Sequence, residues 1–259
     1  AIFSSLNLDM SWKGNVNFLG KYYFSGNLPY YYLFFWIIIS TPLFHLILFI
    51  FGIYNYIKRL ILRYFTIKQH SIYNDLWRSS NEKKDFLIFT NLIFFVFVLS
   101  FLNINLYNSW RLGYFLYIFI IYFAGFGIYL LTIKFKKNLF QLTLVFLALI
   151  IFLIYRIALY HPYQSLYFNV LIPPSIKNSV DVDYTGLSAF HFLKEIIEKE
   201  KNDKPVKIGV ASWYPLWRMV DLLNNEEKNK IIILANEEKN QAKYLYSNRI
   251  YDIDKKYYK

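Results

Sequence analysis

Residues 22–57 read YYFSGNLPYYYLFFWIIISTPLFHLILFIFGIYNYI, a stretch of 36 residues without Asp, Glu, Lys or Arg. Three further charge-free runs follow at 86–110, 112–133 and 138–155, with 25, 22 and 18 residues. A membrane-spanning helix needs about 20 mostly apolar residues. The sequence therefore predicts four transmembrane helices within residues 30–160.

The composition of the whole chain agrees with a membrane protein. Of its 259 residues 56% are apolar and 18% are charged, whereas a soluble domain has about 25% charged residues. The absence of cysteine excludes a disulfide framework, a thiolate metal site and a cysteine nucleophile. Four scattered histidines argue against a zinc site, so we expect neither a metal nor a cofactor.

The distribution of basic residues predicts the orientation of the spans. Ten Lys and Arg residues lie in the expected loops at 58–85 and 134–137, against four on the opposite side. By the positive-inside rule these loops are cytoplasmic, with a helix lying in the membrane interface over residues 57–65. Residues 1–29 are then an extracytoplasmic loop segment and the tail is extracytoplasmic. The basic balance concerns membrane orientation, and we expect no nucleic-acid partner.

The tail, residues 161–259, has the pattern of a small α/β domain of about 100 residues. Leu187, Phe190, Leu193, Ile196 and Ile197 form one apolar stripe at helical spacing. The expected elements are a helix at 187–201, strands at 205–211 and 230–235 with a helical segment at 213–223 between them, and a third strand at 244–246. The predicted fold class is therefore a membrane α-helical protein with four transmembrane helices followed by a small extracytoplasmic α/β domain.

Three aromatic clusters, at 26–32, 107–117 and 160–169, are expected on the outer membrane face. An aromatic belt at the headgroup level explains most of these rings without a function. Arg111 stands apart because a fixed guanidinium at this place can bind a phosphate through two hydrogen bonds. A snorkelling arginine explains the same position, and its spacing leaves both interpretations open.

Two other polar positions are weaker candidates. His45 lies within a span and is either a functional polar group or an imidazole bonded to a helix carbonyl. Asp181 and Asp183 follow the last span, where a carboxylate pair can do acid/base chemistry or bind a cation, and a solvated turn explains them without a function.

Taken in order, four motifs resemble a known family. GNLPYYYLFFWIIISTPLFHLILFIFGIY, YNSWRLGYFLY, HPYQSLYFN and VDYTGLSAFHFLKEI are similar to the C-terminal half of bacterial integral-membrane glycosyltransferases of the GT-C class, in the group of dolichyl-phosphate-mannose protein mannosyltransferases and aminoarabinose transferases. The matching positions are Pro29, Tyr31, Thr41, Pro42, Trp110, Arg111, Tyr114, Phe115, His161, Pro162, Tyr163, Gln164, Tyr167, Phe168, Asn169, Asp183, Tyr184, Gly186, Leu187 and Ser188. The chain departs at Leu112, Ile118 and Thr185, where the family has His, Pro and Trp.

The resemblance implies transfer of a sugar from a polyprenyl-phosphate-sugar donor to a lipid, glycan or protein acceptor. It further implies a bilayer setting in the bacterial inner membrane. It places Trp110 and Arg111 at the donor phosphate. The residues it implies for the substrate are Tyr31, Tyr114, His161, Tyr163, Gln164, Asp183 and Tyr184. The family's catalytic aspartate lies in the first extracytoplasmic loop, which we expect upstream of residue 1, so the catalytic base is not named here.

A second reading comes from a different functional class. Four spans and a tail also suit a membrane anchor that displays an extracytoplasmic α/β module for protein or glycan binding. A transporter is disfavoured because the spans lack acidic residues and the paired Gly or Pro breaks that line an ion or substrate path.

Overall fold

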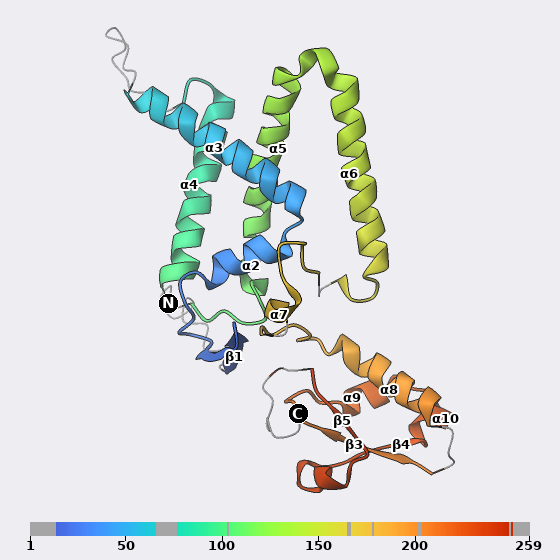
Figure 1. Ribbon diagram of the computed structural model, residues 1–259. Coiled ribbons are helices and arrows are strands. Elements are labelled where there is room, and N and C mark those ends of the chain that lie inside the picture. Colours follow the sequence, from blue (N-terminus) through green and yellow to red (C-terminus); the bar gives the residue numbers. More distant parts are fainter. Residues whose placement is uncertain are drawn as a thin grey trace. The chain divides into compact units, whose positions relative to one another are not determined.

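The computed structural model describes residues 14–65, 77–102, 104–164, 167–177, 179–200, 204–248 and 250. The chain divides into two compact units (Figure 1). The first unit contains 26–161 and 167–172, and the second contains 14–25, 162–164 and 173–250 among the described residues. Each unit is described by itself.

The described residues of the first unit form five α-helices. They are α2 (Tyr32–Ser40), α3 (Leu43–Phe65), α4 (Ser80–Phe101), α5 (Leu116–Lys134) and α6 (Leu139–Leu159), with short 3-10 helices η1 (Arg111–Gly113) and η2 (Lys136–Asn138) before α5 and α6. In the part of the chain that the structure describes, four helical segments are long and apolar enough to cross a membrane: α3, α4, α5 and Lys136–Leu159. The prediction of four such helices from the charge-free runs is confirmed as far as helix length and hydropathy are concerned.

The first charge-free run is divided, contrary to the single span expected from residue 30. Helix α2 ends at Ser40, and Thr41 has an extended backbone with ψ 134°. Pro42 explains the break, because the residue before a proline is disfavoured in the helical region and proline lacks an N–H. Helix α3 then begins at Leu43 and continues through residues 58–65, so the separate interface helix expected at 57–65 is the end of α3.

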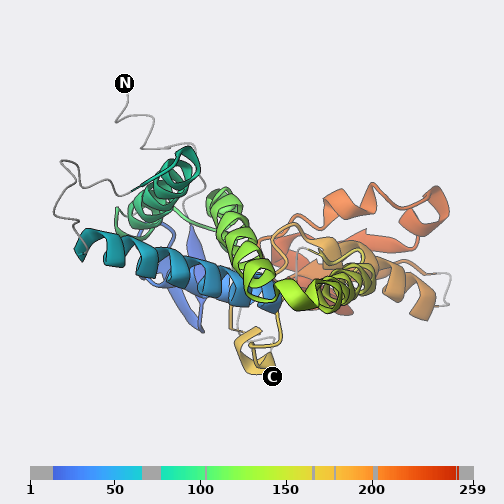
Figure 2. The same cartoon turned by 90° about the horizontal axis from the view of Figure 1, so that it is seen from above.

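Helices α3 and α5 cross with their backbones in contact (Figures 1 and 2). A Cβ atom placed on Gly52 of α3 would lie 1.9 Å from the carbonyl oxygen of Phe123. A Cβ atom on Gly127 of α5 would lie 2.6 Å from the carbonyl oxygen of Leu48. Small residues at such a crossing let helices pack closely inside a membrane, where the hydrophobic effect does not drive association.

Helix α6 forms a hairpin with α5 (Figure 1) and differs from it in burial. None of its residues is buried, whereas Leu116, Ile120 and Phe123 of α5 are. Helix α6 is largely apolar around its circumference, and no described element of the first unit buries any of its residues. A helix of this kind is typical of one that faces lipid hydrocarbon.

The second unit contains two sheets. A hairpin of β1 (Asn15–Phe18) and β2 (Lys21–Phe24) belongs to it, which the interpretation of residues 1–29 as a loop segment did not anticipate. The other sheet has the order β4-β3-β5 with parallel pairing, formed by β3 (Val206–Val210), β4 (Ile231–Ile233) and β5 (Tyr244–Tyr246). The remaining elements are α7 (Pro174–Lys177), α8 (Leu187–Lys199), α9 (Trp217–Val220), α10 (Asn225–Lys228) and η4 (Asn236–Gln241).

The α/β region expected in the tail is present, with one shortened element. The three strands and the helix at 187–199 lie where the sequence predicted them. The predicted helical segment at 213–223 contains only the four-residue α9 (Trp217–Val220). The stripe of α8 packs on the sheet, with Leu193 and Ile208 fully buried between them.

Candidate functional site

Two aromatic clusters of the first unit meet where α2 breaks. The indole N–H of Trp110 donates a hydrogen bond of 2.8 Å to the hydroxyl of Ser40, the last residue of α2. The Ser40 hydroxyl in turn donates to the carbonyl of Trp36 at 2.7 Å. Trp110 is 1% exposed, so this hydrogen bond satisfies a buried donor that would otherwise be costly.

The segment after α6 completes the same cluster. The side-chain amide of buried Asn169 donates to the carbonyl oxygens of Ile38 and Thr41, the latter at 2.8 Å. Its backbone N–H donates to Ile39 at 2.8 Å. These bonds satisfy carbonyl groups that the end of α2 leaves without helical partners. The ring of Phe168 stacks on Trp36 with centroids 6.1 Å apart.

A polar pair lies on the first turns of α3 and α5. Nδ1 of His45 and the hydroxyl of Tyr117 are hydrogen-bonded at 2.8 Å. The Tyr117 ring contacts Trp110 edge-on at 6.3 Å, and Trp110 lies against Tyr114 at 4.9 Å. His45 therefore has a side-chain partner on another helix and is not simply bonded to a carbonyl of its own helix.

Arg111 follows this buried cluster and differs from it in exposure. The preceding residues Asn108 and Ser109 have φ of 53° and 59°, a left-handed conformation that is uncommon for residues with a Cβ. These two residues form a tight turn that leads into buried Trp110, and exposed Arg111 follows as the first residue of η1. Among the residues that the structure describes, no side chain forms a hydrogen bond or an ion pair with the Arg111 guanidinium. The arrangement leaves all its donors available to an anion.

A second arginine lies near the C-terminal end of α6. Arg156 donates to the hydroxyl of Tyr160 at 3.2 Å, and its guanidinium carbon lies 5.0 Å from the centre of that ring. Tyr160 meets Tyr167 edge-on at 5.7 Å. Burial raises the pKa of the Tyr167 hydroxyl, and the positive charge of Arg156 partly opposes this shift. Arg156 thus makes local contacts with aromatic side chains.

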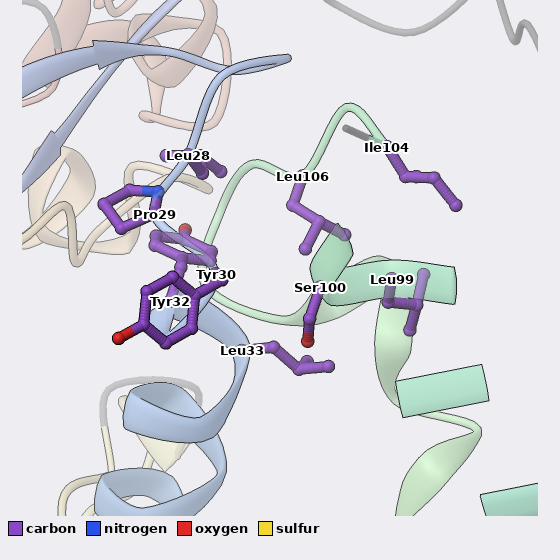
Figure 3. Close-up of a pocket in the computed structure, with 9 residues that line it drawn as sticks. All are labelled: Leu28, Pro29, Tyr30, Tyr32, Leu33, Leu99, Ser100, Ile104 and Leu106. Atoms are coloured by element: carbon purple, nitrogen blue, oxygen red, sulfur yellow. The ribbon is translucent and has the colours of Figure 1, made fainter. Parts of the chain in front are cut away.

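One small cavity is described in the first unit (Figure 3). It lies between the entry to α2, the end of α4 and the following loop, and it is lined by Leu28, Pro29, Tyr30, Tyr32, Leu33, Leu99, Ser100, Ile104 and Leu106. Its volume of about 10 Å³ holds roughly one water molecule. A sugar or a lipid phosphate does not fit there, so any large ligand must bind outside this cavity.

The carboxylates described in the first unit lie away from Arg111. Asp85 accepts hydrogen bonds of 2.6 Å from Arg59 and from the hydroxyl of Tyr122, and Glu82 is paired with Arg63. Ten residues of α4, about 15 Å of helix, separate Asp85 from Phe95, whose ring contacts Phe115. These acids join α3, α4 and α5 and do not face the turn that carries Arg111.

Asp183 lies in the second unit, where its carboxylate caps α8. It accepts hydrogen bonds from the backbone N–H groups of Leu187 at 2.8 Å and Ser188 at 2.9 Å. It also accepts a hydrogen bond from the Ser188 hydroxyl, which is bonded to the Tyr246 hydroxyl at 2.9 Å. Burial raises the pKa of Tyr246. Both carboxylate oxygens of Asp183 are therefore already used in holding the start of the helix.

The other predicted site residues are divided between the two units. Tyr31 and Tyr114 are exposed in the first unit, and His161 lies in the turn after α6. Tyr163, Gln164 and Tyr184 are half-buried in the second unit. Tyr163 lies 5.2 Å from the His191 ring, and burial together with the negative charge of Asp183 raises its pKa. Of the predicted site residues, Trp110 and Tyr114 are in ring contact, and Arg111 lies between them in the chain.

Residue-level reasoning did not single out Ser40, Tyr117 and Asn169 as partners within this site. Of these, Asn169 carries the strongest available signal, because it belongs to the HPYQSLYFN motif. Its partners are 128 and 131 residues away in the chain, so no local pattern identifies them.

A comparison with models of known protein families, with curated proteins and with solved structures finds no match for this chain. The chemistry of the site therefore has to be argued from its own geometry.

Proposed function

We propose that this chain takes part in sugar transfer from a polyprenyl-phosphate-sugar donor, as a portion of a membrane glycosyltransferase of the bacterial inner membrane. The observation that carries the proposal is the exposed guanidinium of Arg111, which directly follows buried Trp110 after the left-handed turn at Asn108 and Ser109. Tyrosine and tryptophan at the membrane interface support headgroup-level binding, and a guanidinium suits a phosphate through paired hydrogen bonds.

Within this proposal Trp110 and Arg111 have different tasks. The indole N–H of Trp110 is used by Ser40, so this residue fixes the turn on α2. The guanidinium of Arg111 then binds the donor phosphate and stabilises the charge that develops on it as the sugar leaves. Tyr31 and Tyr114, which are exposed in the same unit, contribute aromatic surface toward the donor.

The proton of the acceptor hydroxyl needs a separate group. Transfer requires a base within hydrogen-bond reach of that hydroxyl. The carboxylates described in the first unit are ion-paired, and Asp183 is engaged as a helix cap. We therefore assign donor binding, and not proton abstraction, to the described residues, with an extracytoplasmic lipid, glycan or protein as acceptor.

Binding of undecaprenyl phosphate to the purified protein in detergent tests this assignment. A hydrogen bond to a charged group contributes about 1.5–3 kcal/mol, so Arg111→Ala should weaken binding by about tenfold or more. Arg111→Lys should also lose affinity, because an ammonium lacks the paired geometry. Arg218→Ala is the matched control, since Arg218 is also exposed but belongs to the second unit. Native affinity in both Arg111 variants would rule out the assignment.

A binding module on a membrane anchor remains the second candidate, favoured by one feature of the second unit. Trp213 and Trp217 are 58% and 56% exposed, and the Arg218 guanidinium lies 5.2 Å from the Trp217 ring. Exposed tryptophans and arginines are enriched where proteins bind other molecules. Loss of acceptor binding in Trp213→Ala with Trp217→Ala, together with unchanged undecaprenyl phosphate binding in Arg111→Ala, would favour this function.

A further inference from the structure

The hairpin turn between α5 and α6 carries a concentrated positive charge. Lys134, Lys136 and Lys137 lie within four residues, and all three are exposed. Among the described residues none of these lysines forms an ion pair, and the ammonium of Lys134 lies 5.7 Å from the Phe135 ring. The turn therefore has three positive charges without a described counter-charge.

Two arginines of α3 are compensated by acidic residues of α4. Arg59 pairs with Asp85 at 2.6 Å, and Arg63 pairs with Glu82. The two acidic residues at the start of α4 are thus already used by α3. An external anion is therefore bound more favourably by the unpaired lysines of the turn than by these two arginines, whose charges are already neutralised.

The lengths of the flanking helices place the turn at a membrane surface. Helix α5 has 19 residues and α6 has 21, which correspond to about 28 and 32 Å. The hydrocarbon core is about 30 Å thick, so two spanning helices put their connecting turn at the headgroup level. Phe135, Leu139 and Phe140 are exposed beside the lysines, with Phe140 76% exposed. Apolar side chains next to ammonium groups suit the boundary between acyl chains and headgroups.

We propose that this turn binds the headgroups of anionic phospholipids. Residues Lys134–Asn138 line an open hollow, and the charged groups around it match a lipid phosphate in sign. A lipid fits better than a soluble anion because the hollow borders two apolar helices whose exposed side chains contact its acyl chains. The surface is independent of Arg111 and of the proposed transfer reaction.

A local fluorescence measurement tests the inference on the whole chain. Because the sequence has no cysteine, Asn138→Cys gives a single attachment point for bimane within the hollow. The labelled protein is reconstituted in phosphatidylcholine vesicles that contain equal small fractions of either nitroxide-labelled phosphatidylglycerol or nitroxide-labelled phosphatidylcholine. The ratio of quenching by the two lipids reports local enrichment of the anionic one.

The expected result is a quenching ratio well above one for phosphatidylglycerol. Each lysine near a membrane surface contributes about fivefold in affinity for anionic lipid, so three should give a ratio of at least about fivefold. The K134Q, K136Q and K137Q substitutions together should return the ratio to near one. The matched control replaces Lys204, Lys228 and Lys230, which removes the same charge from the second unit and should leave the ratio unchanged.

Three outcomes would overturn the inference. One is a quenching ratio near one for the labelled protein that retains all three lysines. Another is an equal fall in the ratio in the control, since that would assign the effect to net charge. The last is loss of enrichment with millimolar inorganic phosphate but not with chloride of equal ionic strength, which would assign the hollow to a soluble anion.

Discussion

Replacing Gly52 with alanine should force α3 and α5 apart. The new Cβ atom would lie 1.9 Å from the carbonyl oxygen of Phe123 and 2.9 Å from its carbonyl carbon. Both are backbone atoms of a helix, so they cannot rotate away as a side chain can. The helices must therefore separate, and overpacking of this kind costs about 1–3 kcal/mol.

Gly125 of α5 provides the matched control for Gly52→Ala. A Cβ atom on Gly125 meets nothing within 4 Å, so Gly125→Ala adds a methyl group to open space. Alanine is favoured over glycine in a helix by about 1 kcal/mol, and both variants gain this amount. The difference between the two unfolding free energies therefore isolates the cost of the clash, which we expect to be about 1–3 kcal/mol.

Unfolding in mixed micelles with increasing sodium dodecyl sulfate, followed by the helical circular dichroism signal, measures this difference. Gly125→Ala should unfold at or above the native midpoint, and Gly52→Ala clearly below it. Gly127→Ala should behave like Gly52→Ala, because its Cβ atom would lie 2.6 Å from the carbonyl oxygen of Leu48. Equal unfolding free energies for Gly52→Ala and Gly125→Ala would refute close packing of α3 on α5.

Three further predictions concern orientation, an ion pair and alkaline stability. In intact cells an impermeant maleimide should label Asn229→Cys and not Ser79→Cys, because the basic residues predict that α4 begins on the cytoplasmic side. Labelling of Ser79→Cys and not of Asn229→Cys would show that the predicted orientation is wrong. Asp85→Asn removes the charged partner of Arg59 and should lower the unfolding free energy by about 1.5–3 kcal/mol. The control Asp221→Asn changes an exposed carboxylate and should leave the unfolding free energy unchanged, so equal stability of the two variants would contradict this prediction. Burial raises the pKa of the Tyr246 hydroxyl above its ordinary value of 10.0, so this hydroxyl ionises at a lower pH in the unfolded chain than in the folded one. Its contribution to stability is therefore complete below pH 10 and is lost as the pH rises through the folded-state pKa. Near-ultraviolet circular dichroism during alkaline titration should show a smaller loss for Tyr246→Phe than for the native chain, and identical titrations would exclude this contribution.

The sequence by itself determined the number and approximate place of the apolar helices. Charge-free runs of sufficient length are a local property, and the structure has α4, α5 and α6 at the expected runs. The same holds for the stripe of α8 and for the strands β3 to β5, whose apolar residues recur at helical or strand spacing. Arg111 also stood out locally, because it directly follows Trp110 between two apolar runs.

Only the tertiary structure decided which residues meet. The break at Thr41–Pro42 shifts the first span to α3, and the hairpin β1–β2 belongs with a unit formed mainly by the tail. The bonds from Trp110 to Ser40 and from Asn169 to Thr41 join positions 70 and 128 residues apart. Periodicity records which face of an element is apolar, but it carries no information about the partner that covers that face. Such pairings depend on how whole helices pack, as the contact of Gly52 with Phe123 does, and they therefore emerge only when the chain is folded.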